Sequence, residues 1–91
     1  MTLHIVKSSP FTSSALQRCL NSASADDAVV LIEDGIYAMH FAGIHASKAP
    51  LYVLKPDLTA RGIEAINMSK VIAYTDLVEL TLQFPHSITW Q

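Results

Sequence analysis

Short runs of apolar and β-branched residues recur along this chain and are separated by amphipathic or polar stretches. Their length and composition are typical of strands rather than of helices. The runs cover residues 3–6, 28–32, 51–54, 71–73 and 87–90. The run from Ala28 to Ile32 contains no polar residue, which indicates a central strand covered on both faces. The pattern therefore predicts five strands.

The first stretch between these runs has the period of a helix. Its apolar positions recur at i, i+3, i+4 and i+7, and they are Leu16, Cys19, Leu20 and Ala23. This spacing predicts a helix over residues 13–23 with one apolar face. Cys19 belongs to that face.

Three further stretches predict helices, and they are residues 36–46, 57–61 and 75–84. The first of them has a weak pattern. The second is a single turn that we expect Asp57 to cap and Gly62 to end, because an aspartate accepts hydrogen bonds from the first helical amides and a glycine adopts left-handed dihedral angles. The third stops before Pro85, which cannot continue a helix.

Strands that alternate with helices over so few residues imply βαβ units with right-handed crossovers. We therefore predict a three-layer α/β/α fold with a mainly parallel sheet of about five strands and helices on both faces. Ninety-one residues make one domain, spanning residues 1–91, without internal repeats or linkers.

The composition changes this picture in one respect. The chain is 51% hydrophobic and 15% charged, whereas charged residues usually make up about 25% of a soluble domain. A chain of this size buries only about 60–65% of the surface that its unfolded form exposes. It therefore has more apolar material than a small monomer hides, and we expect other subunits to cover part of it.

Charge and cysteine content exclude several classes of function. The net charge is −2 and the six Lys and Arg residues form no basic run, so direct nucleic-acid binding by this chain alone is not expected. No apolar run approaches the roughly 20 residues that span a bilayer. The single cysteine cannot form an internal disulfide, which fits a reducing compartment and predicts a cytoplasmic protein.

Two adjacent carboxylates and a glycine, Glu33, Asp34 and Gly35, follow the predicted central strand directly. Ligands often bind at the carboxyl ends of parallel strands, so this position suits a ligand or acid/base site. The alternative is structural: Asp34 caps the next helix and Gly35 supplies unusual dihedral angles. Neighbouring strand residues point to opposite faces, so the two carboxylates do not converge. We favour the turn and cap, with a subunit-interface or ligand role for Glu33 as the alternative.

Cys19 has two interpretations. A thiolate carries sulfur as a persulfide when it is accessible and its pKa is lowered. A free cysteine on the apolar face of a helix is more often a small buried hydrophobe.

The remaining candidates predict contacts rather than catalysis. Trp90, next to the C-terminus, is expected to lie against a neighbouring element or subunit. His40 and His45 are five residues apart, which does not suit two ligands on one helical face, so no metal site is predicted. The chain has no glycine-rich loop and therefore no predicted nucleotide cofactor.

Six segments carry a resemblance to a known family. They are HIVKSSPF (4–11), CL (19–20), DAVVLIEDGIYA (27–38), LYVLKPDLTARG (51–62), YTDLVELT (74–81) and the closing ITWQ. Together they resemble the DsrH/TusB family of small sulfur-relay subunits, in register over nearly the whole chain.

The resemblance implies a DsrE-like fold and a place in a heterohexamer, a dimer of trimers of TusB-like, TusC-like and TusD-like chains. It implies 2-thiolation of the wobble uridine of certain tRNAs, with sulfur passing as a persulfide to a downstream relay protein. The essential cysteine is implied to lie in the TusD-like chain, so the present chain is expected to be mainly structural rather than catalytic.

Two alternatives remain. DsrH-like chains of sulfur-oxidising bacteria carry a cysteine at the place that matches Cys19, which allows a sulfur-oxidation complex with Cys19 as the sulfur acceptor. The α/β pattern alone also allows a free-standing flavodoxin-like binding module.

Overall fold

A five-stranded sheet forms the centre of the computed structural model, which describes residues 1–91. The strands are β1 (Thr2–Val6), β2 (Ala28–Leu31), β3 (Leu51–Leu54), β4 (Ser69–Ile72) and β5 (His86–Trp90). Their order is β4-β3-β2-β1-β5 and every neighbouring pair is parallel. The predicted parallel five-stranded sheet is confirmed, and β2 lies at its centre, where its uninterrupted apolar run is covered on both faces.

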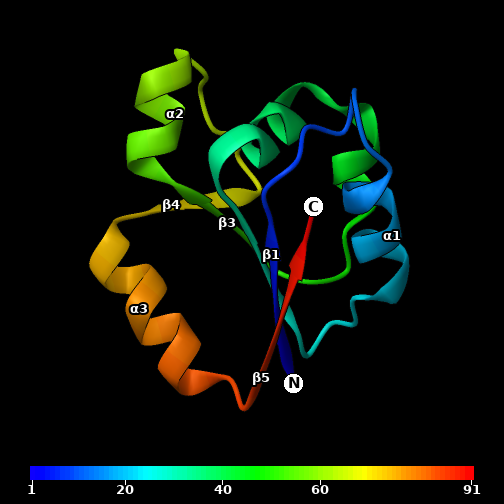
Figure 1. The fold of residues 1–91 in the computed structure, drawn as a ribbon, viewed down its shortest axis with the longest axis vertical. Helices are drawn as coiled ribbons and strands as arrows, with labels where there is room; N and C mark the ends of the chain where they lie inside the picture. Colours follow the sequence, from blue (N-terminus) through cyan, green and yellow to red (C-terminus); the bar gives the residue numbers. More distant parts are fainter.

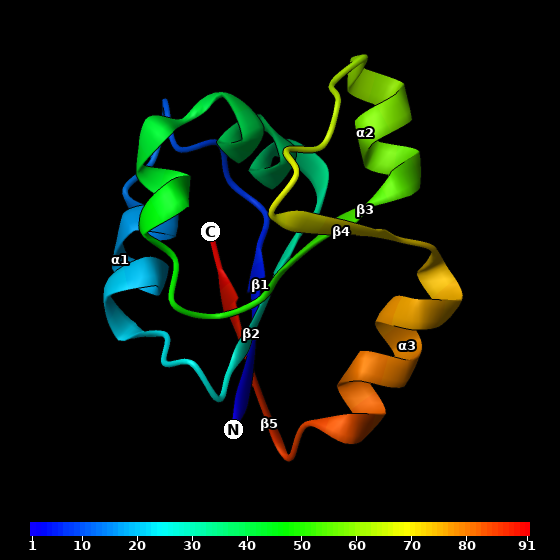
Figure 2. The ribbon, with the colours of Figure 1, turned by 180° about the vertical axis from the view of Figure 1, so that it is seen from behind.

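Helices cover both faces of the sheet, as predicted. The α-helices are α1 (Ala15–Ser22), α2 (Lys55–Arg61) and α3 (Tyr74–Gln83), and two 3-10 helices are η1 (Glu33–His40) and η2 (Ala42–Ala46). Figures 1 and 2 show α1 and α3 on opposite sides of the sheet. No helix here has the length and apolar character needed to cross a membrane.

The two faces are covered unequally. The larger of two core clusters has 16 buried residues, to which α1, η1, η2 and α2 contribute. The smaller has six, and Leu80 is its one member from α3. Leu80 is also the one buried residue of α3. A single helix with one buried side chain therefore covers the second face, with Leu77 and Phe84 packed partly buried beside it.

Residues 36–46 differ from the prediction of one α-helix. They belong to η1 and η2, which are separated at Phe41, whose φ of −102° and ψ of 117° are extended. The apolar pattern of this segment is weak. Short 3-10 helices form its backbone hydrogen bonds and allow the segment to bend along the larger core cluster.

The helix predicted over residues 57–61 begins earlier, at Lys55, and Pro56 lies in its first turn. Proline is well tolerated there because its missing N–H would have no helical partner. Gly62 ends α2 in the left-handed conformation with φ of 63°, as predicted.

Candidate functional site

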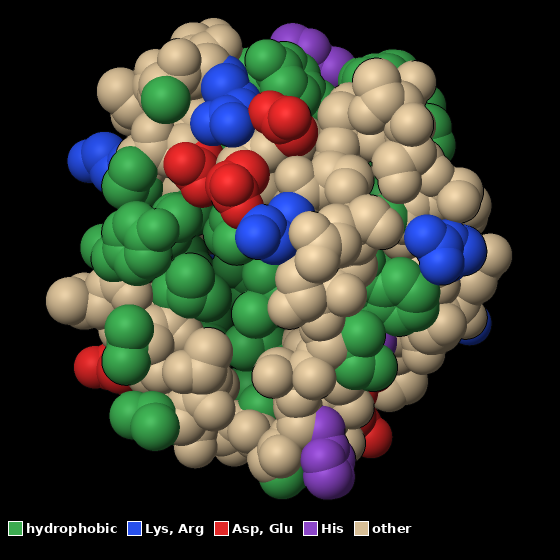
Figure 3. All heavy atoms as spheres, viewed as in Figure 1, with side chains coloured by type: hydrophobic (Ala, Val, Ile, Leu, Met, Phe, Trp, Pro, Cys, Tyr) green, Lys and Arg blue, Asp and Glu red, His purple; other side chains and the backbone are tan.

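Charged side chains of both signs meet at the carboxyl ends of β1, β2 and β3. We call them the carboxyl-edge cluster, and they are Lys7, Glu33, Asp34, Asp57 and Arg61. Glu33 pairs with Lys7 at 3.3 Å, and Asp34 pairs with Arg61 at 3.0 Å. Figure 3 shows charges of both signs gathered near the top of this view, beside α2. The parallel sheet brings these residues together because the carboxyl ends of all its strands lie on the same side of the molecule.

The predicted helix caps at Asp34 and Asp57 are wrong. Neither η1 nor α2 has a side-chain hydrogen bond at its cap. Asp34 Oδ1 instead accepts from Nε and Nη2 of Arg61, at 3.2 and 3.0 Å. Asp57 Oδ2 accepts from the backbone N–H of Glu33 at 2.7 Å. Because β2 and β3 are neighbours, the first turn of α2 lies beside the turn after β2. The residues that follow β2 and those of α2 therefore form hydrogen bonds with one another.

The unusual backbone dihedral predicted for Gly35 lies at Glu33 instead. Glu33 has the left-handed φ, at 50°, whereas the φ of Gly35 is not positive. A Cβ on Gly35 would overlap the carbonyl oxygen of Val6. Gly35 is therefore required by the close approach of η1 to the end of β1, and its lack of a side chain matters more than its conformational freedom.

The geometry of the carboxyl-edge cluster does not suit acid/base chemistry. Glu33 and Asp34 point to different cations, and their side chains are 53% and 62% exposed. Cys19, the one thiol, lies elsewhere, buried in α1. No group of three or more His, Cys, Asp or Glu side chains is placed to hold a metal ion. The cluster ties three strand-to-helix connections together and presents paired charges to solvent.

A second polar cluster joins both ends of the chain. Trp90 Nε1–H donates to Nδ1 of His4 at 3.0 Å, and Nε2 of His4 lies 3.0 Å from Oδ2 of Asp27. Because Nδ1 accepts, His4 carries its proton on Nε2 and donates it to Asp27. The Arg18 guanidinium lies 5.8 Å from the centre of the Trp90 ring. Trp90 therefore contacts β1 and α1 of its own chain.

Asp27 is the acceptor on which this second cluster depends. Besides His4, it accepts the backbone N–H of Thr2 at 2.8 Å and that of Ser24 at 3.1 Å. The hydrogen bond from His4, followed by that from Ser24, lowers the pKa of Asp27 from 3.8 to about 2. This pair of side chains was not predicted from the sequence. The available signal was His4 itself, since a histidine between apolar residues of a buried strand requires a partner.

Cys19 meets neither condition for a persulfide acceptor. Its exposed fraction is 0% and it packs with Leu16 and Leu20 in the larger core cluster. Burial, with a smaller contribution from the negative charge of Asp27, raises the pKa of the Cys19 thiol to about 12. The proposed sulfur acceptor is therefore a buried apolar group in this structure.

Comparisons with known proteins agree over nearly the full length. A family model described as "DsrH like protein" matches residues 8–87. The chain is 39% identical over 95 residues to "Protein TusB" of Pectobacterium parmentieri, covering 97% of this chain and 99% of that protein. It is 32% identical over 97 residues to "Protein TusB" of Escherichia coli, with the same coverage.

A solved structure supports the same relationship. The solution NMR structure of Protein Tm0979 from Thermotoga maritima resembles the present fold with a TM-score of 0.74 and 26% sequence identity. The likeness covers 91% of this chain and 93% of that one. Sequence and fold are thus similar along the same stretch of the molecule.

Proposed function

The chain belongs to the DsrH family, and from this membership we propose that it is a TusB-like subunit of a heteromeric sulfur-relay complex. The end-to-end match to proteins named TusB supports the proposal. The complex contains TusC-like and TusD-like chains in a cytoplasmic heterohexamer. It hands sulfur as a persulfide to a downstream relay protein for 2-thiolation of the tRNA wobble uridine.

Within that complex we assign this chain a mainly structural role. The observation that carries this assignment is the state of Cys19, the only cysteine of the chain. The thiolate is the nucleophile that takes up sulfur. Cys19 has an exposed fraction of 0%, and burial raises the pKa of its thiol to about 12, so the thiol is neither accessible nor ionised at neutral pH. The persulfide is therefore carried by a cysteine of another subunit.

The experiment that tests this role uses a host strain from which the gene for this chain has been deleted. Wild-type protein and Cys19→Ala are each returned to the strain, and the 2-thiouridine content of its tRNA is measured by nucleoside mass spectrometry. We expect the deletion to abolish 2-thiolation and both proteins to restore it.

Two results would contradict the proposal. Unchanged 2-thiolation in the deletion strain would remove the role in tRNA thiolation. Failure of a folded, assembled Cys19→Ala protein to restore 2-thiolation would make Cys19 a sulfur carrier and remove the purely structural role.

A further inference from the structure

Exposed apolar side chains gather on α3 and on the neighbouring segment that contains β4. Eight large hydrophobic side chains are exposed, and five of them lie between residues 68 and 82: Met68, Val71, Tyr74, Val78 and Leu82. Tyr74, Val78 and Leu82 are spaced at i, i+4 and i+8 on α3 and are 63%, 55% and 81% exposed. We call these three the α3 stripe. Figure 3 shows hydrophobic side chains gathered over this helix, at the left of the view.

A groove extends the α3 stripe toward α2. It has a volume of about 480 Å³, and Pro56, Ala60 and Tyr74 are among the residues that line it. Tyr74 belongs to both features, so the stripe and the groove form one continuous and largely apolar surface, with Lys55 and Thr59 also lining the groove. A contiguous surface of this kind marks an interaction site more often than a free face.

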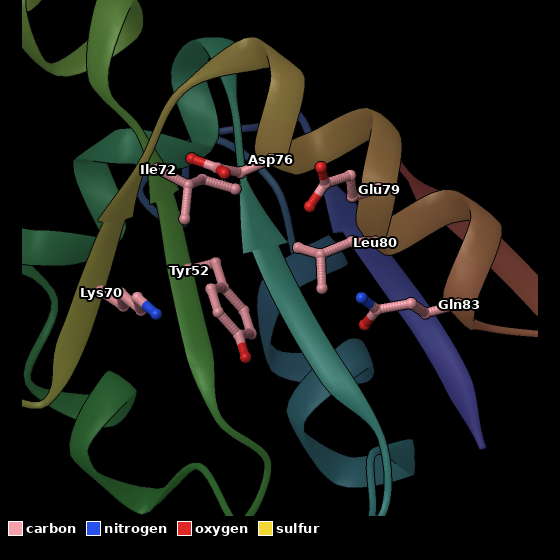
Figure 4. A pocket seen from close by; sticks show the side chains of 7 residues that line it. All are labelled: Tyr52, Lys70, Ile72, Asp76, Glu79, Leu80 and Gln83. Carbon is pink, nitrogen blue, oxygen red and sulfur yellow. The ribbon is translucent and has the colours of Figure 1, made fainter.

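A cavity lies on the other side of α3, between this helix and the sheet. It has a volume of about 230 Å³. Figure 4 shows Asp76, Glu79 and Gln83 projecting from α3 toward Tyr52 on β3 and Lys70 on β4. The cavity and the α3 stripe therefore flank the same helix.

The polar side chains that α3 and β4 contribute to this cavity are exposed to solvent, and most of them have no partner within the chain. Asp76 Oδ2 accepts the backbone N–H of Ala73 at 3.0 Å. Lys70 forms no ion pair with either carboxylate, and Glu79 has neither an ion pair nor a side-chain hydrogen bond. Two carboxylates against one ammonium group give the cavity a net negative charge.

Size and charge together define what the cavity accepts. Small-molecule sites usually have volumes of about 300–1,000 Å³, so this cavity suits a single side chain better than a cofactor. The negative charge favours a cation. A guanidinium group binds a carboxylate such as Glu79 through two hydrogen bonds and also stacks on an aromatic ring such as that of Tyr52. An arginine side chain matches these groups best.

The charges of α3 argue against a second copy of this chain as the partner. The helix contains Asp76 and Glu79 and no Lys or Arg. Two copies paired through α3 about a two-fold axis would bring these carboxylates near their counterparts, which is unfavourable. A different chain with cations at the edge of an apolar surface avoids that repulsion.

We propose that α3 is the docking helix for another subunit of the relay complex, which covers the α3 stripe with apolar side chains and inserts an arginine side chain beside Glu79. The inference rests on the proposed function, because that function supplies the different subunit.

The test measures the affinity of the full chain for the purified pair of TusC-like and TusD-like subunits from the same host, by biolayer interferometry. Glu79→Gln should weaken binding about tenfold, because it removes the charge and keeps the shape. Val78→Arg should weaken binding about 100-fold or more, because it places a cation in the apolar contact. Ile88→Arg is the matched control, since Ile88 is 45% exposed on β5 at the opposite edge of the sheet, and it should bind within about twofold of wild type.

Each outcome decides a separate point. Circular dichroism and urea midpoints should match wild type in all three variants, since the replaced side chains are exposed. If the wild-type chain binds and both Glu79→Gln and Val78→Arg bind with the same affinity, α3 is not the docking helix. The proposed function would still stand in that case. Equal weakening by Ile88→Arg, or a wild-type homodimer that Val78→Arg dissociates, would also overturn the docking helix. Absence of wild-type binding would overturn the proposed function and this inference with it.

Discussion

The indole N–H of Trp90 donates a hydrogen bond to Nδ1 of His4 across 3.0 Å, although the two residues are 86 positions apart in the chain. His4 is 2% exposed and lies on β1, directly beside the last strand, β5. Through its other nitrogen, His4 reaches Asp27 at the start of the central strand β2. One buried imidazole therefore connects the chain's first, second and last strands.

Trp90→Phe should lower the free energy of unfolding by about 1–3 kcal/mol, because it leaves the buried Nδ1 of His4 without a donor. The measurement is urea denaturation of both proteins. The control repeats the substitution in a His4→Leu background, where no imidazole acceptor remains and the loss should be smaller by about 1 kcal/mol. Equal losses in the two backgrounds would contradict a direct coupling between Trp90 and His4.

Asp27 should make stability depend on pH in the acid range. Its pKa falls from 3.8 to about 2 on folding, so its contribution is complete above about pH 4 and is lost as the pH falls toward 2. The shift corresponds to at most about 2.5 kcal/mol. Urea midpoints of wild type and Asp27→Asn should therefore converge between pH 4 and 2. A constant difference across this range would refute the linkage.

Gly35→Ala should be far more damaging than Gly62→Ala. The new methyl group at residue 35 would overlap the carbonyl oxygen of Val6, and we expect a loss of about 3 kcal/mol or more, or failure to fold. Nothing lies within 4 Å of a Cβ at residue 62, so only its left-handed φ opposes alanine, at about 1–2 kcal/mol. Thermal unfolding of the two variants provides the comparison, and similar losses would contradict the contact at Gly35.

Asp34→Ala should cost about 0.5 kcal/mol at low salt and almost nothing in 1 M NaCl, because Asp34 forms an exposed ion pair with Arg61. Asp57→Ala is the matched comparison. It should cost about 1–2 kcal/mol at both salt concentrations, since it removes the acceptor of the Glu33 amide. Urea denaturation at the two salt concentrations measures both effects. A salt-independent loss in Asp34→Ala would instead support a capping role for Asp34.

The features that the sequence predicted correctly depend on short-range pattern. The apolar run of β2 is short and uninterrupted, which identifies a covered parallel strand without knowledge of its neighbours. The helical spacing around Cys19 placed that residue on an apolar face, and the structure buries it there. Residues 36–46 lack a clear period, so the pattern did not distinguish one helix from two 3-10 helices.

The side-chain partners depend on long-range geometry, which a local rule does not contain. Asp34 was assigned to the nearest helix, but Arg61 lies 27 residues further on and reaches it because β2 and β3 are neighbours. The sequence did not reveal that strand order. The same holds for His4 and Trp90, which meet only because β5 returns to pair with β1.

The central claim is that this chain works as one subunit of a complex of different small chains. A native mass spectrum of the tagged chain, purified gently from its own host, tests this claim most directly. We predict that two other small chains co-purify in equal amounts with it, in an assembly of two copies of each. A bare monomer, or an assembly of this chain alone, would contradict the claim.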